Sequence, residues 1–174
     1  VLDMSKIESG NTSLNNEPTY LYDMAKMSAD LCATQIEKKH HHFTLDLSGL
    51  TQDYVLADPV RLRQIFVNLL SNAIKYTPKG STIRICAMNE NGKAKIQVED
   101  NGPGICDEMK PHIFEMFYTG KNTIADSHRS LGLGLALCRS IIEVHNGKLV
   151  LEDNTPHGCI FSFTLPLSEV TLNE

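Results

Sequence analysis

Residues 58–76 constrain the fold of this chain more than any other segment, because they carry the pattern of a long amphipathic helix. Asp58 can cap the free amides of a first turn, and Pro59 stands where a helix needs no backbone N–H. The apolar residues recur at three- and four-residue steps: Leu62, Ile65, Phe66, Leu69, Leu70 and Ala73. A stripe this wide has to be buried against other elements, so the segment predicts a layered domain.

Other periodicities predict two more helices and three pairs of short strands. Apolar residues at 20, 24, 27 and 31 predict one helix reaching about Lys39, and residues 133–145 predict another, with Gly147 as its left-handed cap. Strands are expected at 43–47, 54–57, 83–87, 96–98, 148–152 and 159–165. Asn91-Gly92 is a tight-hairpin signal. Because the helices are bunched and the strands form hairpins, the pattern predicts an α+β layered sheet.

Composition excludes several classes of protein. The 174 residues have a net charge of −5 with scattered Lys and Arg, which disfavours nucleic acid as a partner. No run of about 18 apolar residues is present. The five cysteines form no Cys-x-x-Cys pair, which predicts buried, reduced thiols in a cytoplasmic protein. Three consecutive histidines at 40–42 cannot present three imidazoles to one metal from a single face.

Familiar nucleotide and kinase motifs are missing. Three Gly-Lys pairs occur, but none is followed by Ser or Thr, so there is no P-loop. The protein-kinase motifs His-Arg-Asp and Asp-Phe-Gly do not occur either.

A polar edge on the 58–76 helix is the first candidate for chemistry. It consists of Arg61, Gln64, Asn68, Asn72 and Lys75, spaced so that they share one side of the helix. Arg and Gln are ordinary on a solvated surface, whereas two Asn residues are poor choices for a helix interior. Taken alone, the edge is still compatible with plain surface.

Two glycine-containing segments are the other candidates. Asp100 directly follows a strand and leads into Gly102 and Gly104, so it indicates either a turn or a carboxylate held against the amine of a flat ring. Gly132 and Gly134 precede a helix, where free amides suit a polyphosphate. The polar loop between them, residues 118–130, indicates either a lid or a long surface loop.

In their order along the chain, these segments resemble the ATP-binding domain of sensor histidine kinases, in the superfamily shared with gyrase, mismatch-repair ATPases and heat-shock chaperone ATPases. Residues 68–77 look like the family's N box, and 113–118 are similar to its F box. Asp100-x-Gly102-x-Gly104 and residues 132–135 resemble its two glycine boxes, and 158–166 its closing strand. The resemblance implies a Bergerat fold, a two-layer α/β sandwich with a mixed, mostly antiparallel sheet under three helices.

The resemblance also implies a ligand site for ATP and Mg²⁺. Asp100 would bind the adenine amine, Asn72 would give its amide oxygen to Mg²⁺, and Asn68 beside it would serve the catalytic step. Lys75 would meet phosphate oxygens, and Tyr76 would lie near the nucleotide. The remaining nucleotide contacts implied are Gly102, Gly104, Ile105, Lys121, Arg129, Gly132, Leu133, Gly134 and Leu135.

By the same resemblance, the chain would transfer the γ-phosphoryl group of ATP to a histidine on an upstream dimerisation domain. Residues 1–10 resemble the end of that domain's helix, followed by a linker at 11–17, the catalytic domain at 18–168 and a tail at 169–174. None of the seven histidines is followed by Glu or Asp, so the acceptor is expected outside this chain. The expected partners are that domain, in a homodimeric parent with or without a membrane anchor, and a response-regulator receiver domain.

Two alternatives remain. Hydrolytic relatives typically have Glu one turn before the metal-binding Asn, whereas this chain has Asn68, which disfavours hydrolysis. A module that binds partners without nucleotide is disfavoured by the presence of Asp100, Asn72 and Gly104. The chain departs from the family pattern at Ser130-Leu131 and Cys159-Ile160, which removes neither an adenine contact nor a metal contact.

Overall fold

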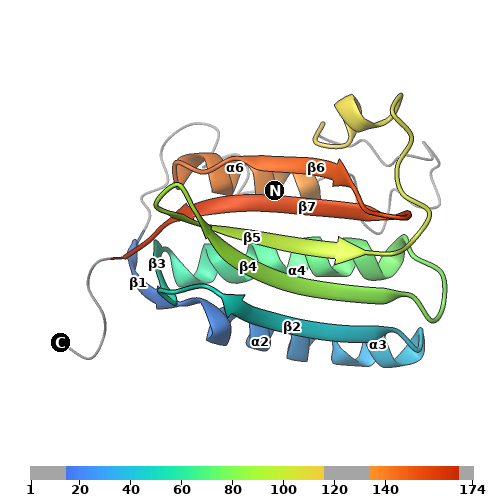
Figure 1. Cartoon of the computed structure of the whole chain (residues 1–174), viewed down its shortest axis with the longest axis horizontal. Helices are drawn as coiled ribbons and strands as arrows, with labels where there is room; N and C mark the ends of the chain where they lie inside the picture. Colours follow the sequence, from blue (N-terminus) through green and yellow to red (C-terminus); the bar gives the residue numbers. More distant parts are fainter. Residues whose placement is uncertain (1–14, 116–133, 169–174) are drawn as a thin grey trace.

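The computed structural model describes residues 15–115 and 134–168, and in them a five-stranded sheet has all of the α-helices on one face (Figure 1). The strands are β2 (His42–Gly49), β4 (Thr82–Glu90), β5 (Lys93–Asp100), β7 (Cys159–Pro166) and β6 (Leu149–Asp153), in that spatial order. β2 runs parallel to β4, and every other pairing is antiparallel. The predicted α+β sandwich with a mixed, mostly antiparallel sheet is confirmed.

Helix α4 (Pro59–Lys75) lies at the centre of the helical layer, between α2 (Leu21–Leu31) and α6 (Gly134–Val144). The whole predicted stripe of α4 is buried, and Phe66 packs edge-on against Phe163 of β7 with ring centroids 5.8 Å apart. Asp58 caps the helix as expected, since its carboxylate accepts from the amides of Val60 and Arg61. The burial of this stripe fixes the orientation of the polar edge of α4.

The predicted single helix at residues 20–39 is wrong, because the chain forms two helices there. α2 ends at Leu31 and α3 (Ala33–Lys38) begins after Cys32. Cys32 is buried, with its Sγ 3.8 Å from the Ser71 hydroxyl of α4, whereas no residue of α3 is buried. The chain therefore turns where the buried face of α2 ends.

The predicted cap of the last helix is wrong by one residue. Asn146, and not Gly147, takes the left-handed conformation after α6, with φ 64°. Gly147 has a different constraint, because a Cβ there would lie 2.0 Å from the backbone oxygen of Thr164. The Asn91-Gly92 hairpin is confirmed, with positive φ at both residues.

Two further features were not predicted. Strand β1 (Glu17–Tyr20) pairs with β3 (Tyr54–Ala57) in a separate two-stranded sheet. Of the five cysteines, Cys106 is exposed, so the prediction of buried thiols holds for the other four only.

No helix in the described ranges is both long and apolar enough to cross a bilayer. Residues 1–14 and 169–174 lie outside the described part, as do the predicted dimerisation helix and tail.

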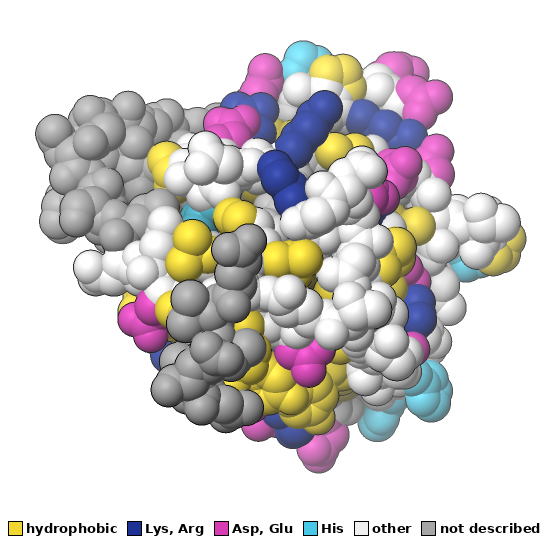
Figure 2. Space-filling model, turned by 60° about the vertical axis from the view of Figure 1, so that its left-hand side comes forward, with side chains coloured by type: hydrophobic (Ala, Val, Ile, Leu, Met, Phe, Trp, Pro, Cys, Tyr) yellow, Lys and Arg dark blue, Asp and Glu magenta, His cyan; other side chains and the backbone are white. Residues whose placement is uncertain are grey.

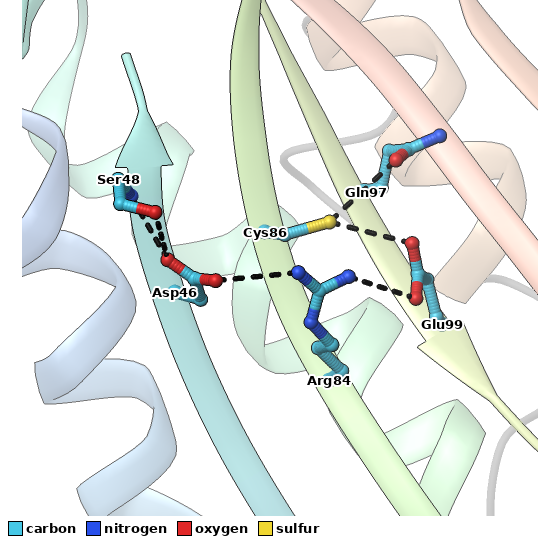
Figure 3. Close-up of polar contacts among 6 residues, drawn as sticks. All are labelled: Asp46, Ser48, Arg84, Cys86, Gln97 and Glu99. Atoms are coloured by element: carbon cyan, nitrogen blue, oxygen red, sulfur yellow. Dashed lines mark hydrogen bonds and ion pairs between the residues drawn. The ribbon is translucent and has the colours of Figure 1, made fainter.

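The face of the molecule drawn in Figure 2 and the open face of the sheet carry mixed charge. On the face drawn in Figure 2, acidic and basic side chains lie intermixed over the upper part. On the sheet, Arg84 of β4 lies between Asp46 of β2 and Glu99 of β5, with a nitrogen–oxygen distance of 3.3 Å to each (Figure 3). Burial, followed by the charge of Glu99, raises the pKa of Cys86 to about 11, so its thiol keeps a proton and donates to Glu99. This network ties three strands together and does not touch the candidate site.

Candidate functional site

The last two turns of α4 carry the polar side chains that the sequence singled out. Asn68 and Asn72 are half-buried and one turn apart, and Lys75 follows on the same side. The Cys138 thiol of α6 donates to the Ile65 carbonyl of α4 at 3.8 Å; burial raises the pKa of this thiol, and the nearby Asn68 side chain opposes that rise. No hydrogen bond ties the Asn72 carboxamide to any residue in the described ranges. Asn68 thus lies near Cys138 of α6, while Asn72 keeps its amide for another partner.

Lys75 has a buried ammonium group without a hydrogen-bond acceptor. Its Nζ is inaccessible to solvent and makes no hydrogen bond with the described residues. It lies 5.2 Å from the centre of the Tyr76 ring, and that ring is itself 38% exposed. A buried charge without an acceptor is costly, so Lys75 favours an anion at this place.

Asp100 ends β5 and is buried, with 7% of the residue exposed. Oδ1 accepts from the backbone amides of Gly102 at 3.0 Å and Cys159 at 3.2 Å. Burial raises the pKa of this carboxyl, and the two amide hydrogen bonds oppose that rise. Within the described residues no donor reaches Oδ2, so this oxygen is the one available to a ligand amine.

The loop between β6 and β7 holds the turn that follows Asp100. Asn154 donates from its side chain to the Asp100 backbone carbonyl at 2.9 Å, and His157 Nδ1 donates to the Gly102 carbonyl at the same distance. Gly158 packs directly on the Asp100 carbonyl. None of these three residues was predicted as part of the site, although Gly158 begins the predicted closing strand at 158–166. The turn-forming run at 154–158 signals a loop, but nothing in it says which strand end the loop covers.

Thr77 joins the two halves of the site. It follows α4, and its methyl group lies against Gly102, where an added Cβ would come within 2.7 Å of it and 3.2 Å of Asp100 Oδ1. The Thr77 hydroxyl donates to the Ala73 carbonyl at 2.7 Å and lies 2.9 Å from His41 Nε2. The end of α4 and the Asp100 turn are therefore in direct contact, although 25 positions separate Thr77 from Gly102.

The other predicted ligand residues divide between the described and undescribed parts of the chain. Gly104 has a positive φ of 83° and lies next to Gly158, and Ile105 packs against the core. Gly134 and Leu135 begin α6. Lys121, Arg129, Gly132 and Leu133 lie outside the described residues, as does the 118–130 loop. In the predicted F box, Ile113 is buried and Phe114 packs edge-on against Phe161.

The residues present fit a magnesium nucleotide. In the described ranges no group of three His, Cys, Asp or Glu side chains is placed to hold a metal ion. Mg²⁺ prefers oxygen ligands and is often held by few protein groups together with phosphates and water. The unengaged Asn72 carboxamide beside the unpaired Lys75 ammonium suits that kind of shell.

Comparison with known proteins agrees with this geometry. Residues 57–169 match the family described as "Histidine kinase-, DNA gyrase B-, and HSP90-like ATPase". Sensor protein KdpD of Clostridium acetobutylicum is 32% identical over 168 residues, which cover 95% of this chain and 18% of KdpD. The Adaptive-response sensory kinase SasA of Thermosynechococcus vestitus is 41% identical over 135 residues, or 75% of this chain and 34% of that kinase. The chain therefore spans less than half the length of these relatives.

One solved structure has the same fold as this chain, and nearly the whole of that solved domain is matched. The catalytic domain of histidine kinase ThkA has a TM-score of 0.76 and 30% identity, and the match covers 88% of this chain and 97% of that domain. ThkA has also been solved in complex with the response regulator protein TrrA. The chain belongs to the histidine kinase-, DNA gyrase B- and HSP90-like ATPase family, and its structural neighbours are histidine kinase catalytic domains.

Proposed function

We propose that this chain binds Mg·ATP between α4 and the Asp100 turn and is the catalytic part of a sensor histidine kinase. One observation carries the proposal. The Thr77–Gly102 contact joins the end of α4 to the Asp100 turn, and among the described residues the buried Asp100 carboxylate has an oxygen without a donor and the buried Lys75 ammonium has no acceptor. Such a pair matches a ligand with an amine at one end and phosphates at the other.

Each end of the site has a specific role in this proposal. Asp100 Oδ2 accepts a hydrogen bond from the exocyclic amine of adenine, while Oδ1 stays bound to two backbone amides. Gly102 and Gly104 have no side chains, so the flat ring can come close to the backbone of the turn. Lys75 binds phosphate oxygens, with Tyr76 beside it, and Gly134 and Leu135 start a helix whose free amides also suit phosphate. Lys121, Arg129, Gly132 and Leu133 remain predicted contacts.

The reaction is transfer of the γ-phosphoryl group to an imidazole nitrogen of another domain. A nitrogen–phosphorus bond forms, the bond from the γ-phosphorus to the bridging oxygen breaks, and ADP leaves. The Asn72 amide oxygen would hold Mg²⁺, and the ion would supply neutralisation of charge on the phosphates. Asn68 stands one helical turn earlier, on the same edge of α4, and would serve the catalytic step. An imidazole is already nucleophilic, so the chain needs no strong base.

The chain's partners follow from this reaction. The acceptor histidine lies on an upstream dimerisation domain, and a response-regulator receiver domain takes the phosphoryl group from it. ThkA, which was solved with its response regulator, supports the second partner. Because the reaction requires ATP, we propose a cytoplasmic location for the domain.

Nucleotide-dependent thermal stabilisation tests the proposal. A non-hydrolysable Mg·ATP analogue is expected to raise the melting temperature of the wild-type chain, and Asp100→Asn and Asn72→Ala are each expected to abolish that rise. Asn16→Ala, in the exposed segment before β1, is the matched control and should keep it. Unchanged shifts in the first two variants would favour a module that binds partners without nucleotide.

A hydrolytic ATPase is the second candidate, and the family includes such enzymes. Asn68 cannot act as a general base, so we expect phosphate release by the isolated chain to stay at background. With γ-labelled ATP, the chain should also fail to label itself, since it contains no expected acceptor histidine. Steady phosphate release well above background would identify hydrolysis as the activity.

A further inference from the structure

Lys39 lies between α3 and β2, outside the segments that carry the candidate site, and its side chain reaches the C-terminus of α4. Its Nζ donates to the backbone carbonyls of Ile74 at 2.8 Å, Thr77 at 2.7 Å and Lys75 at 3.3 Å. The last carbonyls of a helix lack partners inside the helix, and the negative end of the helix dipole favours a cation. An ammonium group has three N–H donors, so one side chain closes this helix end.

The backbone of Lys39 is itself held on both sides. α3 ends with His40 in the left-handed conformation at φ 54°, and the His41 amide donates back to the Ile36 carbonyl at 3.0 Å. The Lys39 carbonyl accepts from the Gly80 amide at 2.8 Å. Gly80 follows α4, so the α3–β2 turn and the end of α4 are bound to each other through side chain and backbone.

Lys39 binds backbone carbonyls at the end of α4, next to the point where the side chain of Lys75, the candidate phosphate contact, leaves the helix. Lys75 itself contributes one of them, and its own ammonium is the buried, unpaired group of the site. Ile74 and Thr77 lie on either side of it. The direction in which the Lys75 side chain leaves the helix therefore depends on a turn that Lys39 holds.

We propose that Lys39 is a positioning residue for the phosphates of the nucleotide. It acts through the Lys75 backbone and does not touch the ligand, and the inference rests on the proposed function. Without the ammonium, three half-buried carbonyls lose a charged donor and the terminal turn of α4 relaxes. Lys75 is then no longer held toward the phosphates, so ligands with phosphates lose affinity while adenosine does not.

The alternative is that Lys39 contributes to stability alone, and three variants separate the two roles. Lys39→Met keeps most of the apolar stem and removes the charge, and Lys39→Arg restores a cation with several donors. Lys38→Met makes the same change one position earlier, on the exposed end of α3, and is the matched control. Dissociation constants for Mg·AMPPNP and for adenosine are measured by calorimetry at a temperature where circular dichroism shows each variant folded.

We expect Lys39→Met to weaken Mg·AMPPNP binding about tenfold, the scale of one lost hydrogen bond to a charged group, and to change adenosine binding less than about twofold. Lys39→Arg should bring Mg·AMPPNP binding back to within about threefold of wild type, and Lys38→Met should match wild type. If Lys39→Met does not fold, Lys39→Gln, which keeps an amide donor, is measured with the same expectation.

Three results would overturn the inference. A Lys39→Met protein that melts earlier yet binds Mg·AMPPNP like wild type would make Lys39 a stability cap only. An equal loss for adenosine and Mg·AMPPNP would rule out the route through Lys75. A wild-type chain that binds neither ligand would overturn the proposed function and this inference together.

Discussion

Gly158 lies so close to the carbonyl group of Asp100 that an added Cβ would be 1.9 Å from its oxygen. Gly158 also has a positive φ of 115°, which side chains rarely adopt. The β6–β7 loop thus packs against the end of β5 through the backbone of Gly158, which has no side chain. This contact, with the Asn154 and His157 hydrogen bonds beside it, holds the turn that carries the candidate adenine contact.

Gly158→Ala is therefore expected to destabilise the fold and to displace Asp100. Overpacking at a closely packed position costs about 1–3 kcal/mol, and the left-handed strain adds about 1 kcal/mol. Urea unfolding gives the stability, and Mg·AMPPNP calorimetry gives the affinity, which should fall. Gly80→Ala is the control, since Gly80 also has a positive φ but open space around it, and it should lose only the smaller strain energy. Equal losses in both variants would contradict the close contact.

Asp100→Asn is expected to separate stability from ligand binding. Burial raises the pKa of Asp100, so the folded state binds this proton more tightly than the unfolded chain. The stability contributed by the protonated form is present at low pH and is lost as the pH rises through the raised value. At neutral pH, Asp100→Asn should unfold at the same urea concentration as wild type or a higher one, while its nucleotide-induced stabilisation disappears. A clear loss of stability in the ligand-free variant at neutral pH would contradict this account.

His41 is expected to make the fold sensitive to mild acid. It is 8% exposed, and burial lowers its pKa below the usual histidine value of 6.5. The unfolded chain then binds the proton more tightly, so stability is complete above about pH 6.5 and falls as the pH drops toward the lowered value. His41→Gln, which keeps an N–H donor toward Thr77, should flatten urea stability between pH 7.5 and 5.5. His42→Gln, at the exposed neighbouring position, should keep the wild-type pH dependence.

Asp58→Ala should destabilise the helix that carries the site. Asp58 Oδ1 accepts from Val60 N at 3.0 Å, and Oδ2 accepts from Asn15 N at 3.1 Å. Loss of an N-cap acceptor costs about 1–2 kcal/mol, measured as a shift of the urea midpoint. Asp58→Asn keeps a capping oxygen and should retain most of the stability. A loss in Asp58→Asn as large as in Asp58→Ala would show that the cap hydrogen bond is not the cause.

Local pattern was sufficient for some of the regular elements. The buried stripe and Asp cap of α4, and the Asn91-Gly92 hairpin, follow from periods and turn chemistry that act over a few residues. The errors occur where a distant contact overrides local preference. Burial of Cys32 beside Ser71 divides one predicted helix, and the Thr164 carbonyl, rather than a helix cap, explains Gly147.

The candidate site shows the same division. Residue type and order were enough to single out Asn72, Lys75 and Asp100, because amides, ammonium groups and carboxylates carry their chemistry wherever they stand. Only the tertiary structure decided that Thr77 touches Gly102, that Asn154 and His157 hold the Asp100 turn, and that Lys39 closes α4. Each of these contacts joins residues 25 or more positions apart, and such approaches depend on how the sheet and helices pack, not on any local pattern.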